Sequence, residues 1–247
     1  MHLFKKLAKA FMIILLAAVT GFALAGCGGS GASSSSAKAP AAGAAKTPAK
    51  PGDKLIIRML DIGQGDAFLL EKDGKFAMID TGDVEHREAL VKYLHEYGVK
   101  ELSNVIITHP HADHMGGMKA VFDNIKVDNI YDDGVPTNTN TYKTYLKNIK
   151  TKNIPFHIPK AGETIALFDG VDFHVAGPVS EITDQKGRPD LNNNSIVGKL
   201  TYGDFSMLFT GDAEKEEESA ILKSGFGLKS DCLLYTSPSP RDRQKSR

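Results

Sequence analysis

The sequence predicts an α/β domain, and two features of the chain carry this prediction. Short runs of strand length, apolar or alternating, are interleaved with segments of helical period, as in layered folds of helices and sheets. The length of 247 residues suits one domain with room for a leader and a linker. Acidic and basic residues balance at 30 each, so no overall charge draws the chain toward nucleic acid. This balance neither excludes nor supports a local basic groove.

The first 26 residues have the pattern of a secretory signal. Three lysines precede an almost wholly apolar run at 11–25, which ends in small residues before Cys27. The ending Leu-Ala-Gly-Cys at 24–27 resembles the lipobox of bacterial lipoproteins. That resemblance implies lipidation of Cys27, removal of residues 1–26 and a membrane anchor on the extracytoplasmic face. The alternatives are an uncleaved transmembrane anchor, for which the apolar run is short, or a plain signal followed by an unrelated cysteine.

Residues 27–53 predict a flexible linker. Gly, Ser, Ala, Pro and Lys dominate this stretch, and after Cys27 it has no large apolar side chain. Such a segment cannot bury enough surface to offset the loss of chain entropy on folding. We therefore expect a tether that holds the domain at 54–234 away from the membrane.

The first half of the domain alternates between strands and helices. Strands are predicted at 54–61, 67–71 and 76–80, separated by a glycine-rich turn at 63–66 and a hairpin signal at 72–75. A helix at 85–97 places Leu90, Tyr93, Leu94 and Tyr97 on one face and stops at Gly98. A short apolar strand at 104–108 and a helix at 115–122 follow.

The second half of the domain continues the same alternation of strands and helices. Strands are predicted at 129–131, 164–168, 173–176, 195–202 and 206–210, and a charged helix at 213–223. No period typical of solenoid repeats is present.

The segment 108–117 carries the chemistry, because it places three histidines and an aspartate between an apolar strand and a Gly-Gly pair. Alternate side chains of a strand share a face, so His109 and His111 can reach one metal. Asp113 and His114 follow where the chain turns into a helix and can reach a second metal. Imidazole and carboxylate suit Zn²⁺, and also Mn²⁺ or Fe²⁺. The alternative is a solvated histidine-rich loop.

This segment resembles the His-x-His-x-Asp-His signature of the metallo-β-lactamase superfamily, which implies a four-layer αββα sandwich. Further motifs resemble the hydrolase domain of the ComEC competence proteins. They are Leu-Asp-Ile-Gly-Gln-Gly-Asp-Ala at 60–67, Ile-Asp-Thr-Gly at 79–82, Asn-Asn-Asn-Ser-Ile-Val at 192–197 and Thr-Gly-Asp-Ala-Glu at 210–214. The similarity runs from about residue 55 to residue 234.

The resemblance implies roles for four aspartates and two metal ions, either Zn²⁺ or Mn²⁺. Asp212 would bridge the two metals and, with Asp113, belong to the catalytic residues. Asp80 would orient the histidine loop by hydrogen bonding without binding metal itself. Asp66 is either a turn residue or part of the wall of the site. A turn role is also the alternative for Asp80 and Asp212.

The Asn192–Ser195 stretch lies where many superfamily members have a third histidine for the first metal. Asn192 and Ser195 are expected to play a polar supporting role beside the ligands, or else to cap the following strand. His174 is the nearest other imidazole, but its alternation with apolar neighbours favours an ordinary strand position. The remaining domain histidines, His86, His95 and His157, are expected at the surface.

Residues 235–247 do not fit the family pattern. In ComEC-like domains a segment resembling Asp231 to Leu234 leads into a His-His-Gly-Ser motif that supplies the last ligand of the second metal, whereas a polar Pro- and Arg-containing stretch follows here. We interpret 235–247 as a non-native tail on a truncated domain that lacks this ligand, with reduced stability or activity. Cys232 is then expected to be an unpaired, non-catalytic core residue beside the break.

These observations predict an extracytoplasmic hydrolase that uses a metal-bound hydroxide at a dinuclear site. The ComEC resemblance implies a phosphodiesterase or nuclease acting on DNA during uptake. No serine nucleophile motif or phosphate-binding glycine loop is present. The alternatives are hydrolysis of another ester or a lactone, and a non-catalytic lipoprotein that binds an extracellular polymer.

Overall fold

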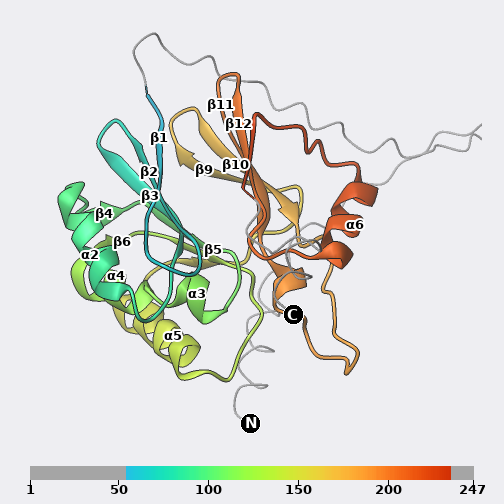
Figure 1. The fold of residues 1–247 in the computed structure, drawn as a ribbon, viewed down its shortest axis with the longest axis horizontal. Coiled ribbons are helices and arrows are strands. Elements are labelled where there is room, and N and C mark those ends of the chain that lie inside the picture. Colours follow the sequence, from blue (N-terminus) through green and yellow to red (C-terminus); the bar gives the residue numbers. More distant parts are fainter. Residues whose placement is uncertain (1–53, 235–247) are drawn as a thin grey trace, which may run out of the picture. The chain divides into compact units, whose positions relative to one another are not determined.

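The computed structural model describes residues 54–234, so the predicted leader, the linker with Cys27 and the tail lie outside this part of the chain. The predicted α/β class is confirmed, and so is the four-layer order (Figure 1). Helices cover one sheet, a second sheet packs on the first, and helix α6 covers the second sheet. Among residues 54–234, no helix is long and apolar enough to span a membrane.

The first sheet has six strands in the order β1-β2-β3-β5-β7-β8. The strands β1 to β3 are antiparallel, and from β3 onward neighbouring strands run parallel. Their bounds are β1 Ile56–Met59, β2 Ala67–Lys72, β3 Lys75–Thr81, β5 Asn104–Ile107, β7 Ile130–Asp132 and β8 Phe156–His157. A separate parallel pair joins β4 Glu101–Leu102 and β6 Lys126–Val127. The helices of this half are α2 Arg87–Glu96, α3 Ala112–Met115, α4 Met118–Asn124 and α5 Asn140–Lys152.

The second sheet has five strands in the order β13-β12-β11-β10-β9, with only the β12–β13 pair parallel. Their bounds are β9 Thr164–Phe168, β10 Val171–Gly177, β11 Val197–Tyr202, β12 Phe205–Phe209 and β13 Cys232–Leu234. A 3₁₀ turn, Asn192–Asn194, precedes β11, and α6 Lys215–Ser224 follows β12.

Side-chain alternation along the strands produces the layers. On β3, Met78 packs in the core beneath the helices, while its neighbour Ile79 packs in the core between the two sheets. On β12, Phe209 faces the first sheet and Leu208 faces α6. Each sheet therefore has two buried faces, which explains why its central strands are almost continuously apolar.

The predicted helix at 115–122 is two helices in the structure. α3 ends at Met115 and α4 begins at Met118, with Gly116 and Gly117 between them. A Cβ at Gly117 would overlap the carbonyl oxygen of Thr81, so the chain needs glycine where it passes this close to the end of β3.

Helix α5 was not predicted. Only three of its side chains are buried, Tyr142, Tyr145 and Ile149, and the rest of the stretch is rich in Asn, Thr and Lys. The apolar face of this helix is therefore hard to recognise in the sequence. The predicted core position of Cys232 is wrong, because β13 is an edge strand and this free thiol is exposed.

Candidate metal centre

The histidine segment lies at the end of a buried parallel strand of the first sheet. β5 ends at Ile107, and His109 and His111 occupy the loop between this strand and α3, not a continuation of the strand as expected. His109 is fully buried. The backbone of His111 is extended, and this residue is the N-cap of α3. The loop rather than strand alternation therefore brings the two rings together.

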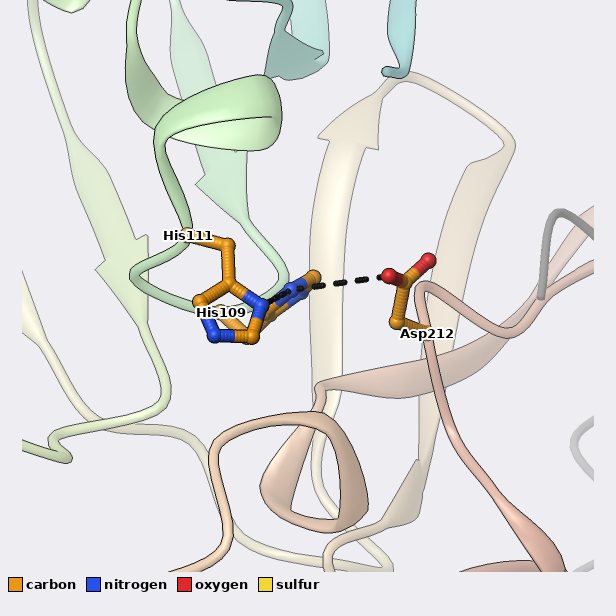
Figure 2. Close-up of side chains that lie close together, drawn as sticks. All are labelled: His109, His111 and Asp212. Atoms are coloured by element: carbon orange, nitrogen blue, oxygen red, sulfur yellow. Dashed lines mark hydrogen bonds and ion pairs between the residues drawn. The ribbon is translucent and has the colours of Figure 1, made fainter. Parts of the chain in front are cut away.

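The first cluster consists of His109, His111 and Asp212. The Nε2 of His109 lies 2.9 Å from the Nδ1 of His111 and 4.0 Å from the Oδ2 of Asp212. Figure 2 shows the two rings side by side with the carboxylate facing His109. Asp212 follows β12 of the second sheet, so this cluster joins the two sheets.

The second cluster consists of Asp66, Asp80 and His114, all three buried. Its ligand atoms lie within 4.8 Å of one another. The Nε2 of His114 also lies 3.4 Å from the Oδ1 of Asp212. Asp212 therefore contacts a histidine of each cluster, one with each carboxylate oxygen.

Asp80 fixes the histidine loop by three hydrogen bonds. It accepts from the backbone N–H of Thr108 and from the Thr108 hydroxyl, both at 2.7 Å, and it lies 2.9 Å from the Nδ1 of His114. Asp80 has a φ of +52°, a region that Asp tolerates better than most residues. Because Nδ1 of His114 faces Asp80, the Nε2 of this ring is turned toward Asp212.

The electrostatics differ between the two buried histidines. Burial and the nearby His114 hold the pKa of His109 well below its usual range, so His109 is neutral. Burial also lowers the pKa of His114, but the Asp80 and Asp212 carboxylates outweigh burial and raise it to about 11. Burial raises the pKa of Asp212, yet its hydrogen bond and charge interaction with His114 leave this pKa below its usual value.

Gly65 sets the position of Asp66 in the second cluster. Its φ is +92°, and a Cβ on it would overlap the carbonyl oxygen of Asp113. The turn at 63–66 can therefore pack directly on α3 only with glycine at this position. The Gly-Gln-Gly-Asp turn is thus part of the support of the site.

Asp113 is partly buried in the first turn of α3, and its side chain belongs to neither cluster. The metal-ligand role expected for it stays a prediction.

The hydrogen bonds of Asn192 and Ser195 go to residues near the starts of β11 and α6, and the supporting role expected for them stays a prediction. The Asn192 side chain donates to Glu214 at 3.3 Å, and the Ser195 hydroxyl donates to the carbonyl of Asn192 at 2.8 Å. Sequence reasoning missed Asn193, which is buried and accepts the backbone N–H groups of Glu214 and Glu217 at 3.2 Å each. It ties the turn before β11 to the start of α6.

The other domain histidines lie away from both clusters. His174 faces Thr164 and Thr201 at 3.0 Å each, as an ordinary strand residue. His86 pairs with Asp83, His157 stacks on Tyr131, and His95 is exposed in the last turn of α2.

The residues present fit divalent metal ions. Neutral His109 offers an imidazole lone pair beside His111, as a metal ligand must. Around His114, the negative charge of two carboxylates favours a positive charge nearby, strongly enough to keep the imidazole ring protonated. A divalent cation would supply the same positive charge in place of the proton. Imidazole nitrogens and carboxylate oxygens together favour Zn²⁺-type or Mn²⁺-type ions.

The sequence and fold now define the class. A family model described as the metallo-beta-lactamase superfamily matches residues 60–241, and the chain belongs to this superfamily, whose members are generally metal-dependent hydrolases. Within it, the chain is similar to the ComE operon protein 3 of Bacillus subtilis, with 27% identity over 72% of this chain and 24% of that protein. It is also 27% identical to the competence protein ComA of Neisseria gonorrhoeae, over 75% of this chain and 24% of that protein.

The chain thus spans about a quarter of the length of these two relatives. Among solved structures, it is similar to the metallo-beta-lactamase SMB-1 bound to mercaptoacetic acid. That comparison has a TM-score of 0.47 and 15% identity, and it covers 76% of this chain and 79% of the other.

Proposed function

We propose that this protein is an extracytoplasmic, metal-dependent phosphodiesterase with nuclease-like activity, anchored to a membrane through a lipid on Cys27. The metal ions would be two divalent cations, Zn²⁺ in the first place and Mn²⁺ as the alternative. The substrate would be DNA or another phosphodiester.

The observation that carries the proposal is the position of Asp212 between the two clusters. Its two carboxylate oxygens face His109 and His114 separately, at 4.0 Å and 3.4 Å. A carboxylate placed in this way suits two metal ions a few ångströms apart, an arrangement used for the hydrolysis of phosphate esters. When bound, the ions would supply an activated water near neutral pH and stabilise negative charge in the transition state.

The protein's own residues prepare this chemistry. Complete burial keeps His109 neutral and hence ready to bind a cation. Asp80 holds the ring of His114 so that its Nε2 faces Asp212. The Asp80–Thr108 bonds hold the backbone of the loop in place before any ion binds.

The phosphodiester substrate is supported by the two competence proteins named above, and the site motifs at 60–67 and 210–214 are the ones that carried the ComEC resemblance. The extracytoplasmic location and the lipid anchor rest on the leader pattern and the Leu-Ala-Gly-Cys ending alone.

The test uses the chain expressed without residues 1–26 and with Cys27 replaced by Ser. Bound metal is quantified by mass spectrometry, and hydrolysis of bis-p-nitrophenyl phosphate and of linear DNA is measured for the wild type, His111→Ala and the exposed-histidine control His95→Ala. We expect bound divalent metal, with at most two ions per chain because the second metal is expected to lack one ligand. We also expect turnover of both substrates, reduced by that missing ligand, and a further loss of at least a hundredfold in His111→Ala alone.

Metal binding without turnover of either phosphodiester would point instead to another ester or a lactone. A folded chain that takes up no metal would support a non-catalytic binding module. Localisation is tested separately by metabolic labelling with a palmitate analogue, which should mark the full chain but not a Cys27→Ser variant.

A further inference from the structure

A pocket with a mixed polar and apolar lining is formed on the helical side of the domain, partly by residues of α3, the helix that carries His114. It has a volume of about 190 Å³ and is formed by the start of α2, the α3–α4 junction and the first turns of α5. Helix α5 lies beside α3 and α4 in Figure 1. The residues that line it are Val84, Arg87, Met115, Met118, Lys119, Asn140, Thr141, Thr144 and Tyr145.

The charged side chains that line this pocket are all of one sign. Arg87 and Lys119 are its charged lining residues, and both are positive, although the whole chain is balanced. Lys119 also forms an ion pair with Asp123 at 2.6 Å, so Arg87 supplies most of the uncompensated charge. The Nε of Arg87 donates to the carbonyl of Gly116 at 2.7 Å, which fixes the guanidinium at the pocket wall. Within residues 54–234 the two terminal nitrogens of Arg87 make no hydrogen bond or ion pair. They remain available for a planar, two-oxygen acceptor such as phosphate.

The polar rim of the pocket is compatible with the same ligand. Asn140, Thr141 and Thr144 come from the beginning of α5, whose first turn contains no acidic side chain. The cap residue Thr139 accepts the N–H of Tyr142, which leaves the N–H groups of the first two helical residues at the pocket end of the helix. These groups add partial positive charge to that of the Arg87 guanidinium.

The short helix α3 connects this pocket to the metal centre. His114 faces the second cluster, while the next residue, Met115, lines the pocket, and Gly116 anchors Arg87. A helix with its side chains is about 10 Å across. Phosphates a few nucleotides apart on one strand can therefore occupy both places.

We infer that the pocket bounded by Arg87, Lys119 and Thr141 binds a backbone phosphate of a polynucleotide while another phosphodiester of the same strand, a few nucleotides away, lies at the metal centre. This inference rests on the proposed function and specifies it, because it requires a substrate with several phosphates. The pocket then explains how a chain without net positive charge holds a nucleic acid strand.

The first experiment measures binding of a fluorescent single-stranded 12-mer to metal-free protein, so that catalysis plays no part. We expect Arg87→Ala to weaken binding on the order of tenfold and to reduce the slope of log K against log salt by about 0.7, the value for one lost phosphate contact. Thr141→Glu, which introduces an anion at a helix position where acids are favoured, should weaken binding by a similar factor without unfolding the helix. The matched controls are Lys75→Ala, at the first residue of β3, and Thr151→Glu, in the last turn of α5.

The second experiment compares two substrates in the metal-loaded protein. We expect KM for the 12-mer to rise at least fivefold more than KM for bis-p-nitrophenyl phosphate in both Arg87→Ala and Thr141→Glu. Equal losses on the two substrates would show damage to the metal centre and overturn the inference. So would oligonucleotide binding and salt dependence that match those of the two controls.

The two failures can be told apart. If the wild type hydrolyses bis-p-nitrophenyl phosphate but the pocket variants bind the 12-mer normally, the inference fails and the proposed function stands. If the wild type hydrolyses no phosphodiester, the proposed function fails, and binding of the 12-mer by the metal-free protein still decides the pocket. Inorganic phosphate that binds the pocket and is not displaced by the 12-mer would overturn the polynucleotide assignment.

Discussion

The Nδ1 of His114 lies 2.9 Å from the Oδ2 of Asp80, and both side chains are buried. This contact decides which nitrogen of His114 is free to face Asp212. It also joins the end of β3 to α3, so the orientation of a candidate ligand depends on the packing of two separate elements. Buried hydrogen bonds of this kind tune metal sites without contributing a ligand.

We predict that Asp80→Asn lowers metal affinity by about 10- to 100-fold while leaving the fold intact. Asn tolerates the φ of +52° at this position, so the substitution removes the negative charge and leaves the backbone conformation unchanged. Affinity is measured by competition with a chromophoric chelator. Asp73→Asn is the matched control, because Asp73 has a φ of +51° on an exposed hairpin. Equal affinity in the two variants would contradict the role of Asp80.

We predict that Gly65→Ala destabilises the domain by about 2–4 kcal/mol. The φ of +92° is unfavourable for alanine, and its Cβ would overlap the backbone of Asp113. The control is Gly74→Ala, where φ is +72° but the Cβ would meet open space, so only the conformational cost of about 1 kcal/mol remains. Urea denaturation measures both. Similar midpoints for the two variants would show that the contact with α3 is not close in solution.

We predict that Glu217 makes the domain less stable as pH rises. Burial, and then the Asp133 carboxylate, raise the pKa of Glu217 to about 9 from an ordinary value of 4.5. Between these two values the folded state keeps a proton that the unfolded chain has lost. The contribution of Glu217 is therefore fully present below about pH 4.5 and is lost progressively as pH rises toward 9.

The substitution Glu217→Gln tests this dependence. It should reduce the fall in Tm between pH 5 and pH 8.5. At pH 8 it should raise the free energy of unfolding by about 1–2 kcal/mol. For a domain of this size, each kcal/mol corresponds to a change in Tm of roughly 2–4 °C. Part of the fall in Tm should remain in this variant, because burial and Asp132 also raise the pKa of Asp133 to about 9. The exposed Glu216→Gln serves as the control. A slope equal to that of the wild type would refute the assignment.

We predict that Asn193→Ala costs about 1–3 kcal/mol, because two backbone N–H groups at the start of α6 lose their buried acceptor. The same change should lower activity, since Asp212 lies between β12 and the start of this helix. Asn148→Ala on α5, where the side chain donates to one carbonyl, is the matched control and should cost less. Chemical denaturation and turnover of bis-p-nitrophenyl phosphate measure the two effects.

The fold class and the proximity of the three histidine rings were both predictable from the sequence. His109, His111 and His114 could be grouped because three histidines within six residues, directly after a buried strand, favour a shared metal site over a solvated loop. The approach of Asp212 from the second sheet is a long-range contact, and only the family resemblance placed it there. The support by Asn193 could not be separated from that of its neighbours in a run of three asparagines, since the choice depends on how the turn docks on α6.

Local patterns failed where tertiary packing decides the outcome. Helix α5 buries just Tyr142, Tyr145 and Ile149, so its apolar face is too narrow to stand out among Asn, Thr and Lys residues. Cys232 was expected in the core because it lies in the ComEC-like segment at 231–234, but burial of a strand depends on having neighbours on both sides of it. The role of Asp113 stays a prediction, since no local pattern fixes which way a partly buried side chain in a first helical turn points.

The two sheets contribute to the metal centre separately, with the histidines from the first and Asp212 from the second. An ion held by both would therefore act as a cross-link that forms only when the sheets are docked, and its binding free energy would add to that of folding. A ligand present at a hundred times its Kd would contribute about 2.7 kcal/mol in this way. Chelation should then behave as a mild denaturant, and the chain's resistance to proteases would depend on the supply of metal in its surroundings.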